Sequence, residues 1–221
     1  KQITALARRR KLPVIVDAAA QLPPQSNLKR FIAEGADLVA YSAGKAIGGP
    51  QACGFLCGRR DLIMSAALQH LDLDIYPDMW HPPKSLIDKR KLQGMPPHGI
   101  GRTCKVGKEE IAGLLTALHL FVAEGDAARH ARWLAILKRI RRDIPQRRDL
   151  KVWIENESAT GAVPLLVLAL DGKPGSASAA IDHMARQKQP VHADPAMRDL
   201  NHIIINPLCL KDSEATLVAR A

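Results

Sequence analysis

The stretch Gly35–Gly58, GADLVAYSAGKAIGGPQACGFLCG, decides the fold of this chain. Its apolar run Asp37–Tyr41 has the length and composition of a short buried strand. The run leads through Ser42 and a turn of small residues to Lys45, a lone amine among Ala, Ile and Gly. Lysines usually lie on solvated faces, so a plain surface turn is the alternative interpretation of this stretch.

A second strand-like run lies upstream, where Val14–Ala20 reads VIVDAAA and places a carboxylate at Asp17. Parallel neighbouring strands end at the same edge of a sheet, where open α/β sheets bind ligands. We therefore expect Asp17 and Lys45 to face one crevice. A desolvated lysine can form a Schiff base, and a carboxylate can hold a pyridine nitrogen protonated. These are the two protein groups that pyridoxal phosphate (PLP) chemistry requires.

The pair Gly44-Lys45 also invites comparison with the phosphate-binding loop of NTPases. That motif requires a glycine at position 39 and a hydroxyl residue at position 46. The chain has Val39 and Ala46 instead, so the sequence excludes this class of phosphate site.

Three stretches of the chain resemble the PLP-dependent enzymes related to selenocysteine synthase, a family that includes the D-glucosaminate-6-phosphate ammonia-lyases. They are VIVDAAAQLPP, NLKRFIAEGADLVAYSAGKAIGGPQACGFLCGRRDLI and GRTCKVGKEEIAGLLTAL. A strand-end Asp, a Ser-x-x-Lys and a GGPQ follow one another in the family's order. The resemblance implies an α/β fold: the C-terminal part of a fold type I PLP enzyme large domain, with a mostly parallel sheet and helices on both faces, followed by a small α+β domain.

The resemblance also implies roles for single residues. Lys45 would bind PLP covalently and later act as the general base at the substrate α-carbon. Asp17 would contact the pyridine nitrogen, Ser42 the cofactor phosphate, and Ala19 would lie beneath the ring. Both roles of Lys45 need an amine that is neutral part of the time, so we expect it to be buried. Taken singly, Asp17 can also cap a turn, and Ser42 is a common turn residue.

Two positions depart from the family's pattern. Ala43 stands where family members usually have Gly, and Cys53 stands where Ser or Gly is common. Neither change removes a catalytic group, although Ala43 adds a Cβ in a tight turn.

The candidates for substrate recognition are Arg102 and Lys105, close to positions where relatives carry basic residues. A guanidinium group presents a planar fork suited to carboxylate or phosphate, which predicts a small anionic amino-acid-type substrate. A solvated basic cluster at the start of a helix is the alternative interpretation. His81 and His98, in a long loop, are further candidates for substrate contacts. The eight histidines show no HxxxH or HExxH spacing, so no metal site is predicted.

The composition limits the kinds of partner that we expect this chain to bind. The chain has 221 residues and a formal net charge of +10, with basic runs at Arg8–Lys11 and Lys138–Arg148 that fall on predicted helices. Aromatic residues make up only 4%, which argues against the stacking surfaces of single-strand nucleic-acid binders, so we expect no tRNA partner. The four cysteines show no zinc-ligand pattern and favour a reducing, cytoplasmic location. No run of about 20 apolar residues indicates a membrane span.

Periodicity predicts two domains: a partial cofactor-binding large domain at 1–125 and a small C-terminal α+β domain at 126–221. Helices are expected at 2–11, 26–34, 61–71, 108–124, 126–142 and 176–187, and strands at 12–17, 37–42, 54–57, 151–154, 163–170, 190–192 and 202–205. The strand at 54–57 follows a short connection and is expected to pair antiparallel. Residues 72–101 are expected to form a long functional loop.

The chain begins with Lys1 inside a predicted helix, and family members are considerably longer. We therefore expect it to be the C-terminal portion of such a protein, because the phosphate cup and the ring-stacking side chain of relatives precede this point. The favoured activity is β-elimination by α-proton abstraction, as in the ammonia-lyases. Selenium transfer to seryl-tRNA is one alternative, and a non-catalytic remnant unable to bind PLP is another. The resemblance further implies a homo-oligomer.

Overall fold

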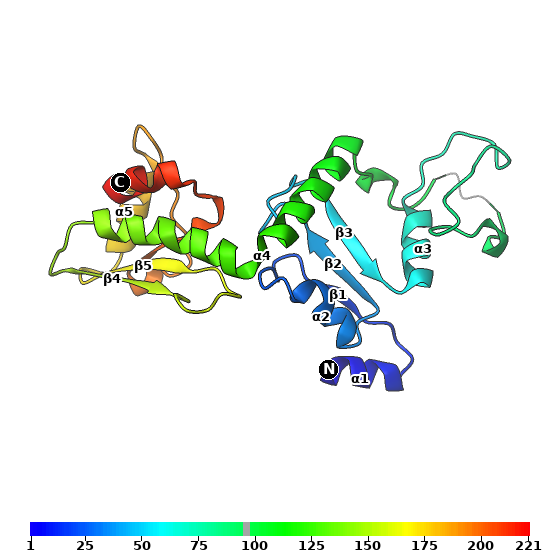
Figure 1. The fold of residues 1–221 in the computed structure, drawn as a ribbon, viewed down its shortest axis with the longest axis horizontal. Coiled ribbons are helices and arrows are strands. Elements are labelled where there is room, and N and C mark those ends of the chain that lie inside the picture. Colours follow the sequence, from blue (N-terminus) through cyan, green and yellow to red (C-terminus); the bar gives the residue numbers. More distant parts are fainter. Residues whose placement is uncertain (95–97) are drawn as a thin grey trace. The chain divides into compact units, whose positions relative to one another are not determined.

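The protein is described by a computed structural model that covers residues 1–94 and 98–221. The described residues form two compact units (Figure 1). Unit 1 comprises Lys1–Leu22 and Ser26–Ala123, and unit 2 comprises Pro23–Gln25 and Glu124–Ala221. The units meet in the chain at Ala123 and Glu124, beside the division expected at residues 125 and 126.

Unit 1 is built on a three-stranded sheet in the order β1-β2-β3. β1 pairs parallel with β2, and β3 pairs antiparallel with β2, as the short connection predicts. Its helices and strands are α1 (Gln2–Arg9), β1 (Ile15–Asp17), α2 (Asn27–Ala33), β2 (Leu38–Ser42), β3 (Gly54–Gly58), α3 (Arg60–Gln69) and the first part of α4 (Lys108–Asp143), with 3₁₀ helices at Lys89–Lys91 and Arg102–Cys104.

The middle strand β2 supplies most of the buried surface of this sheet. Val39 is fully buried, and the Tyr41 ring stacks on Phe55 of β3 with ring centroids 4.9 Å apart. β3 can lie this close because Gly54 has no side chain: a Cβ there would overlap the carbonyl oxygen of Tyr41. The sequence GFLCG therefore specifies tight pairing of β3 with β2.

Asp37, just before β2, ties three segments of unit 1 together. Its Oδ2 accepts a hydrogen bond from the Val14 backbone N–H at 2.8 Å, and its Oδ1 accepts one from Arg59 Nη1 at 3.0 Å. These two bonds lower the pKa of the Asp37 carboxyl below its ordinary value. Asp37 thus fixes the start of β1 and the start of α3 on β2.

β1 is shorter than predicted, since only Ile15–Asp17 of the expected strand 12–17 pairs with β2. Lys11 has a φ of 55°, which reverses the chain direction after α1, and Pro13 carries no N–H for a ladder. Strand pairing can begin only after these two residues.

Unit 2 is an antiparallel sheet in the order β4-β5-β6, packed against helices. Its buried core includes Leu137 and Ile140 of α4, Leu166 of β5 and Ile203 of β6. The elements are the second part of α4, β4 (Leu150–Glu155), β5 (Leu165–Leu170), α5 (Ser176–Ala185), β6 (His202–Ile205) and α6 (Ala215–Arg220), with 3₁₀ helices at Arg198–Leu200, Pro207–Cys209 and Asp212–Glu214.

One prediction for unit 2 is wrong, and one helix was not predicted. The strand expected at 190–192 is not formed, because Val191 N–H donates to the Met184 carbonyl oxygen. Among the described residues, this segment pairs with β6 through one isolated bridge, from Asp194 to Ile204. The C-terminal helix α6 was not predicted, because its six residues are too few to show a helical period.

The helix α4 runs through both units and is interrupted at Gly125, whose φ of 71° and ψ of 165° are not helical. This agrees with the prediction of two successive helices. By length and composition alone, α4 is apolar enough to cross a membrane, although Leu114 in unit 1 and Ile136 in unit 2 are buried in protein cores. The expectation that nothing spans a membrane remains a prediction.

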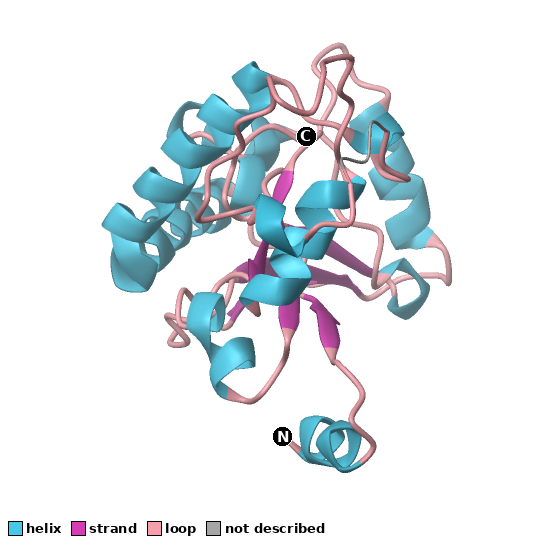
Figure 2. Ribbon diagram, turned by 90° about the vertical axis from the view of Figure 1, so that its right-hand side faces the viewer, coloured by secondary structure: helices cyan, strands magenta, loops and turns pink. Residues whose placement is uncertain are grey.

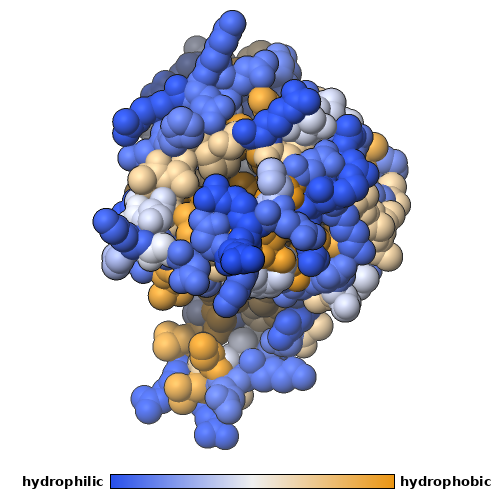
Figure 3. Space-filling model, turned by 90° about the vertical axis from the view of Figure 1, so that its left-hand side faces the viewer, coloured by the Kyte–Doolittle hydropathy of each residue, from blue (hydrophilic) through white to orange (hydrophobic). Residues whose placement is uncertain are grey.

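The α1 helix presents apolar side chains to solvent. Figure 2 shows it at the N-terminal end, apart from the strands of unit 1. Its contacts with α2 are polar, since Thr4 Oγ1 donates to the Glu34 carbonyl oxygen at 2.8 Å. Ile3 and Leu6 of α1 and Ile15 of β1 are all at least 60% exposed. Figure 3 shows apolar surface at the bottom of the view, over α1, bordered by hydrophilic surface.

Candidate cofactor and substrate site

The structure places Asp17, Ser42 and Lys45 at one edge of the unit 1 sheet. Asp17 is the last residue of β1 and pairs with Ala40, and Ser42 ends the parallel neighbour β2 two residues later. Lys45 follows in the turn beyond β2. The parallel pairing of β1 with β2 thus brings the carboxylate, the hydroxyl and the amine to the carboxyl ends of the two strands, as the sequence predicts.

The segment that follows Asp17 is held in place by backbone bonds. Ala18 N–H donates to the Ala40 carbonyl oxygen at 2.8 Å, and the Ala18 side chain is buried. Asp17 Oδ1 accepts a hydrogen bond from Ala19 N–H at 2.9 Å, so this oxygen does cap the turn. The second oxygen, Oδ2, has no hydrogen bond to any described residue and remains available to a ligand.

Asn27 and Tyr41 brace this segment, and sequence reasoning assigned neither of them to the site. The Asn27 Nδ2 group donates to the Gln21 carbonyl oxygen at 2.7 Å, which fixes the loop between β1 and α2. Tyr41 Oη donates to the Asn27 carbonyl oxygen at 2.7 Å, and burial raises the Tyr41 pKa. The Asn27 side chain is buried, which the local sequence pattern does not reveal.

The turn that carries Lys45 is closed on itself. Ala43 N–H donates to the Cys53 carbonyl oxygen at 3.0 Å, and the Ala43 carbonyl accepts from Gly49 N–H at 2.9 Å. The Ala43 side chain is completely buried against Cys53 and Leu114. The departure from the family's glycine at position 43 is therefore accommodated by packing, and the turn keeps its shape.

The expectation that Lys45 is buried is wrong for the described residues. Its side chain is exposed, although Ala43 and Ile47 on either side of it in the turn are buried. Neither Lys45 Nζ nor Ser42 Oγ has a hydrogen bond or ion pair to a described residue. Both groups are thus available to a ligand.

The donor set at this edge fits PLP. The group needs a carboxylate for its ring nitrogen, an amine for its aldehyde and a hydroxyl for its phosphate. Asp17 Oδ2, Lys45 Nζ and Ser42 Oγ are the matching atoms, and none of them is engaged elsewhere among the described residues. Ala19, half-buried beside Asp17, adds no bulk that would exclude a flat ring.

The predicted anion-binding residues Arg102 and Lys105 come together on a different feature of unit 1. Arg102 Nε lies 2.6 Å from Asp72 Oδ1, and Lys105 Nζ pairs with Asp72 Oδ2. His98 Nδ1 lies 3.5 Å from Oδ1 of the same carboxylate. The hydrogen bond from Lys105 and the neighbouring charge of Arg102 lower the pKa of Asp72. His81 is exposed and makes no interaction with a described residue.

An apolar groove of about 500 Å³ begins beside Lys105. It is lined by side chains of β3, α3, α4 and the segment just before α4, among them Leu56, Ile63, Val106 and Leu114. No interaction between described residues links the Asp72 cluster to Lys45. The structure therefore brings the predicted cofactor residues together and the predicted anion-binding residues together, as two groups.

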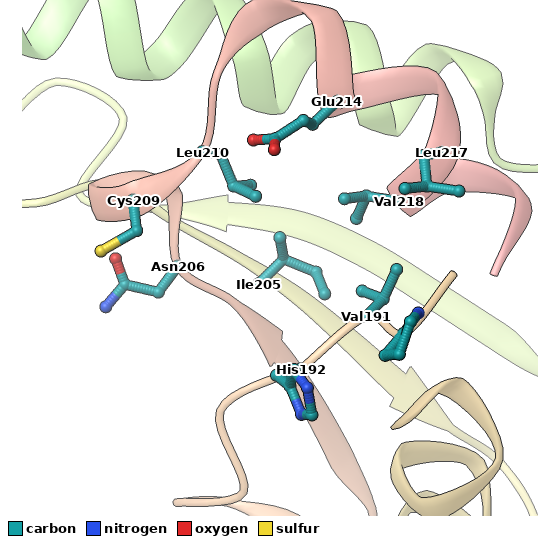
Figure 4. A pocket seen from close by; sticks show the side chains of 10 residues that line it. Val191, His192, Ile205, Asn206, Cys209, Leu210, Glu214, Leu217 and Val218 are labelled. Carbon is teal, nitrogen blue, oxygen red and sulfur yellow. The ribbon is translucent and has the colours of Figure 1, made fainter. Parts of the chain in front are cut away.

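Unit 2 contains a separate, smaller cavity of about 230 Å³ (Figure 4). Its walls are mixed: Val191, Ile205 and Val218 contribute apolar surface, and Asn206 and Glu214 contribute polar surface. Glu214 is already committed, since its Oε2 accepts a hydrogen bond from Lys211 N–H at 2.7 Å. The cavity contains none of the predicted site residues.

Comparison with known proteins shows what the chain is similar to. Residues 2–74 match the sequence pattern of SelA, L-seryl-tRNA selenium transferase. The 5'-C-glycyluridine monooxygenase-decarboxylase of a Streptomyces species is 27% identical over 224 aligned positions, which cover 99% of this chain and 48% of that protein. The D-glucosaminate-6-phosphate ammonia lyase of Salmonella typhimurium is 34% identical over 113 positions, 51% of this chain and 22% of that protein. The chain is thus similar in sequence to members of the selenocysteine synthase-like family.

Solved structures confirm the predicted fold class. The D-glucosaminate-6-phosphate ammonia-lyase structure superposes with a TM-score of 0.67 at 23% identity, over 98% of this chain and 50% of that chain. The Escherichia coli cysteine desulfurase CsdA gives a TM-score of 0.50 at 15% identity, over 98% and 52%. Both are fold type I PLP enzymes. The chain spans about half the length of the Streptomyces protein and of the two solved structures, and the aligned part covers 22% of the Salmonella protein.

Proposed function

We propose that this chain provides the lysine and the ring-nitrogen carboxylate of a PLP-dependent lyase acting on an anionic amino acid or amino sugar acid. The observation that carries the proposal is the convergence of Asp17, Ser42 and Lys45 at the carboxyl ends of β1 and β2, with their polar atoms available. The ammonia lyase, similar in sequence and in fold, supports an elimination.

PLP, when bound, supplies an electron sink for a carbanion at the substrate α-carbon. Lys45 Nζ takes the α-proton, and Asp17 holds the ring-nitrogen proton that the sink requires. Ser42 Oγ donates a hydrogen bond to the cofactor phosphate.

Elimination then breaks the bond from the β-carbon to its leaving group, which departs with the bonding electrons. The enamine product takes up water and yields a keto acid and ammonia.

Arg102 and Lys105 are proposed to bind the carboxylate or phosphate of the substrate. Their side chains are 51% and 63% exposed, and they present two positive charges toward solvent around one carboxylate. The arginine fork suits either anion, so the substrate class is stated as anionic without a choice between the two.

The decisive experiment is a comparison of the complete protein with its Lys45→Ala variant. Addition of PLP should give the wild type a visible absorption band at a wavelength above about 400 nm, as expected for a lysine-bound cofactor. The variant should lack this band. Ammonia and keto acid should form only in the wild type. Lys29→Ala, which removes an exposed lysine of α2, is the matched control and should retain the band. An unchanged band in Lys45→Ala contradicts the assignment.

Selenium transfer is the second candidate, and the match of residues 2–74 to SelA favours it. Transfer and elimination share the removal of the α-proton by Lys45 and differ in what adds afterwards. Conversion of seryl-tRNA, with no keto acid from any hydroxylated or phosphorylated amino acid, would replace elimination by transfer. The basic surface of α1 does not by itself favour tRNA, because its aromatic content is nil.

The 221 residues alone provide a test of a third alternative, a non-catalytic remnant. Equilibrium dialysis against PLP should show saturable binding to this chain if the three groups at the sheet edge suffice. Absence of binding to the 221 residues, together with binding to the complete protein, would assign the remaining affinity to segments outside them.

We also propose that the complete protein is a cytoplasmic homo-oligomer. The four cysteines are free thiols, as expected in a reducing compartment. The exposed apolar residues of α1 and β1 provide surface for association. Sedimentation of the active protein as a strict monomer would contradict the oligomer.

A further inference from the structure

Asp72 lies at the neck of the long loop, where two chain segments meet. Asp72 and His98 form an antiparallel bridge, and Gly99 N–H donates to the Leu71 carbonyl oxygen at 2.8 Å. Gly101 N–H donates to the Gln69 carbonyl oxygen at 2.7 Å, which places Arg102 directly beyond the neck. The backbone therefore fixes the position of Asp72 independently of its side chain.

The side chains at the neck differ in exposure. The Asp72 side chain is only 14% exposed, whereas the cations that surround it reach solvent. One carboxylate faces two permanent positive charges, Arg102 and Lys105, and His98 adds a third when it is protonated. The cluster therefore keeps at least one uncompensated positive charge on its solvent side.

The pairing of Arg102 with Asp72 is not an optimised fork. Arg102 Nε is 2.6 Å from Asp72 Oδ1, yet this buried oxygen accepts no hydrogen bond from a described residue. A guanidinium forms its strongest carboxylate contact through two parallel N–H bonds, which this geometry does not provide. An incoming anion that offers such a fork can compete for the same guanidinium.

We propose that Asp72 is an internal competitor at the anion site, occupying Arg102 and Lys105 until a substrate phosphate or carboxylate replaces it. This inference rests on the proposed function, because it takes Arg102 and Lys105 as the substrate-anion site. The replacement breaks ion pairs to Asp72 and forms equivalent pairs to the ligand, with no change in covalent bonds. Asp72 thus sets the affinity for the anion by opposing it.

The test is a calorimetric titration of inorganic phosphate into the complete protein and its Asp72→Asn variant. Removal of the competing carboxylate should raise phosphate affinity by roughly tenfold, the scale of one strong local charge. Asp74→Asn is the matched control: it removes the same charge two residues away, from an exposed side chain without an ion pair to a described residue, and should leave the affinity unchanged. Weaker or unchanged phosphate binding by Asp72→Asn overturns the proposal. Weaker binding would show instead that Asp72 positions Arg102 and Lys105 for the anion.

A second measurement needs no folded variant. In the wild type, the ¹³C signal of the Asp72 carboxyl should shift as phosphate is added, while that of Asp74 should not. A stationary Asp72 signal at phosphate saturation overturns the exchange. The visible band of bound PLP reports separately on Lys45, so loss of the band with intact phosphate exchange would reject the proposed function and leave the anion site.

Discussion

At the scale of single residues, the two carboxylate oxygens of Asp17 have different roles. One carboxylate oxygen caps the turn at Ala19, and the other is available to a ligand at the carboxyl edge of the sheet. Replacement by Asn preserves the shape and one acceptor oxygen, but it removes the negative charge. Asp17→Asn therefore separates the structural duty from the electrostatic one.

We expect Asp17→Asn to keep PLP on Lys45 but to slow exchange of the substrate α-proton by at least about 100-fold, because a neutral amide does not hold the ring nitrogen protonated. Proton exchange into deuterated water, followed by NMR, measures this directly. Asp194→Asn is the control, since Asp194 Oδ1 makes the same kind of turn contact, to Ala196 N–H at 2.9 Å. Equal exchange rates in all three proteins would remove Asp17 from the site.

The sequence predicted the positions of Asp17, Ser42 and Lys45 because each follows directly from the end of a short apolar run. It could not predict the partner of Arg102 and Lys105. Asp72 lies 30 and 33 residues away in the sequence, and it reaches them only through the bridge with His98. The exposure of the Lys45 side chain also could not be predicted from the local sequence, because it depends on which other segments pack over the turn.

At the scale of elements, Asp37 joins β1, β2 and the start of α3, and its lowered pKa makes that junction depend on pH. A carboxyl with a folded-state pKa below its unfolded value stabilises the fold fully above the unfolded value, about 3.9. The contribution is lost as the pH falls through the lowered folded value. The junction should therefore weaken only under acid conditions.

The corresponding prediction concerns the melting temperature of Asp37→Asn. It should be lower than that of wild type at pH 7, and the gap should narrow as the pH falls below about 4. Thermal unfolding followed by circular dichroism across this range measures the gap. Asp74→Asn should melt with wild type at every pH, and a gap for Asp37→Asn that is constant with pH would show that its ionisation contributes nothing.

Sheet elements were predicted where the apolar run and its turn residues agree. The reversed β3 follows from the short connection after β2 and from the glycines that allow close pairing. The strand wrongly predicted at 190–192 shows the limit of this reasoning. A short apolar run between polar residues is as typical of a packed loop as of a strand. Val191 is buried in the unit 2 core without joining the sheet.

At the scale of the whole molecule, the distribution of apolar surface is uneven. α1 buries no residue, and Ile3 and Leu6 of this helix are exposed together with Ile15 of β1. Exposed apolar patches of this kind mark surfaces that associate with other polypeptide. The 221-residue chain should therefore bind hydrophobic dyes and self-associate.

We expect the double variant Leu6→Glu, Ile15→Thr to reduce binding of a hydrophobic fluorescent dye by at least about twofold with an unchanged circular dichroism spectrum. Leu200→Glu is the control, because Leu200 is an exposed apolar residue of unit 2 and lies outside α1 and β1, 63% exposed. Sedimentation velocity of the same proteins reports on association. Dye binding that persists in the double variant would show that the dye binds to apolar surface outside α1 and β1.

The short segment Pro23–Gln25 belongs to unit 2 although the chain on either side of it belongs to unit 1. Gln25 N–H is shared between the two Asp126 carboxylate oxygens, at 3.0 and 2.9 Å, across 101 residues of sequence. In an unfolded chain, closing a loop of that length costs about 4 kcal/mol, more than one such bond returns. Once unit 1 has folded, Leu22 and Ala123 are fixed on one body and the free chain is short. Folding of unit 1 therefore lowers the entropic cost of bringing this segment to Asp126.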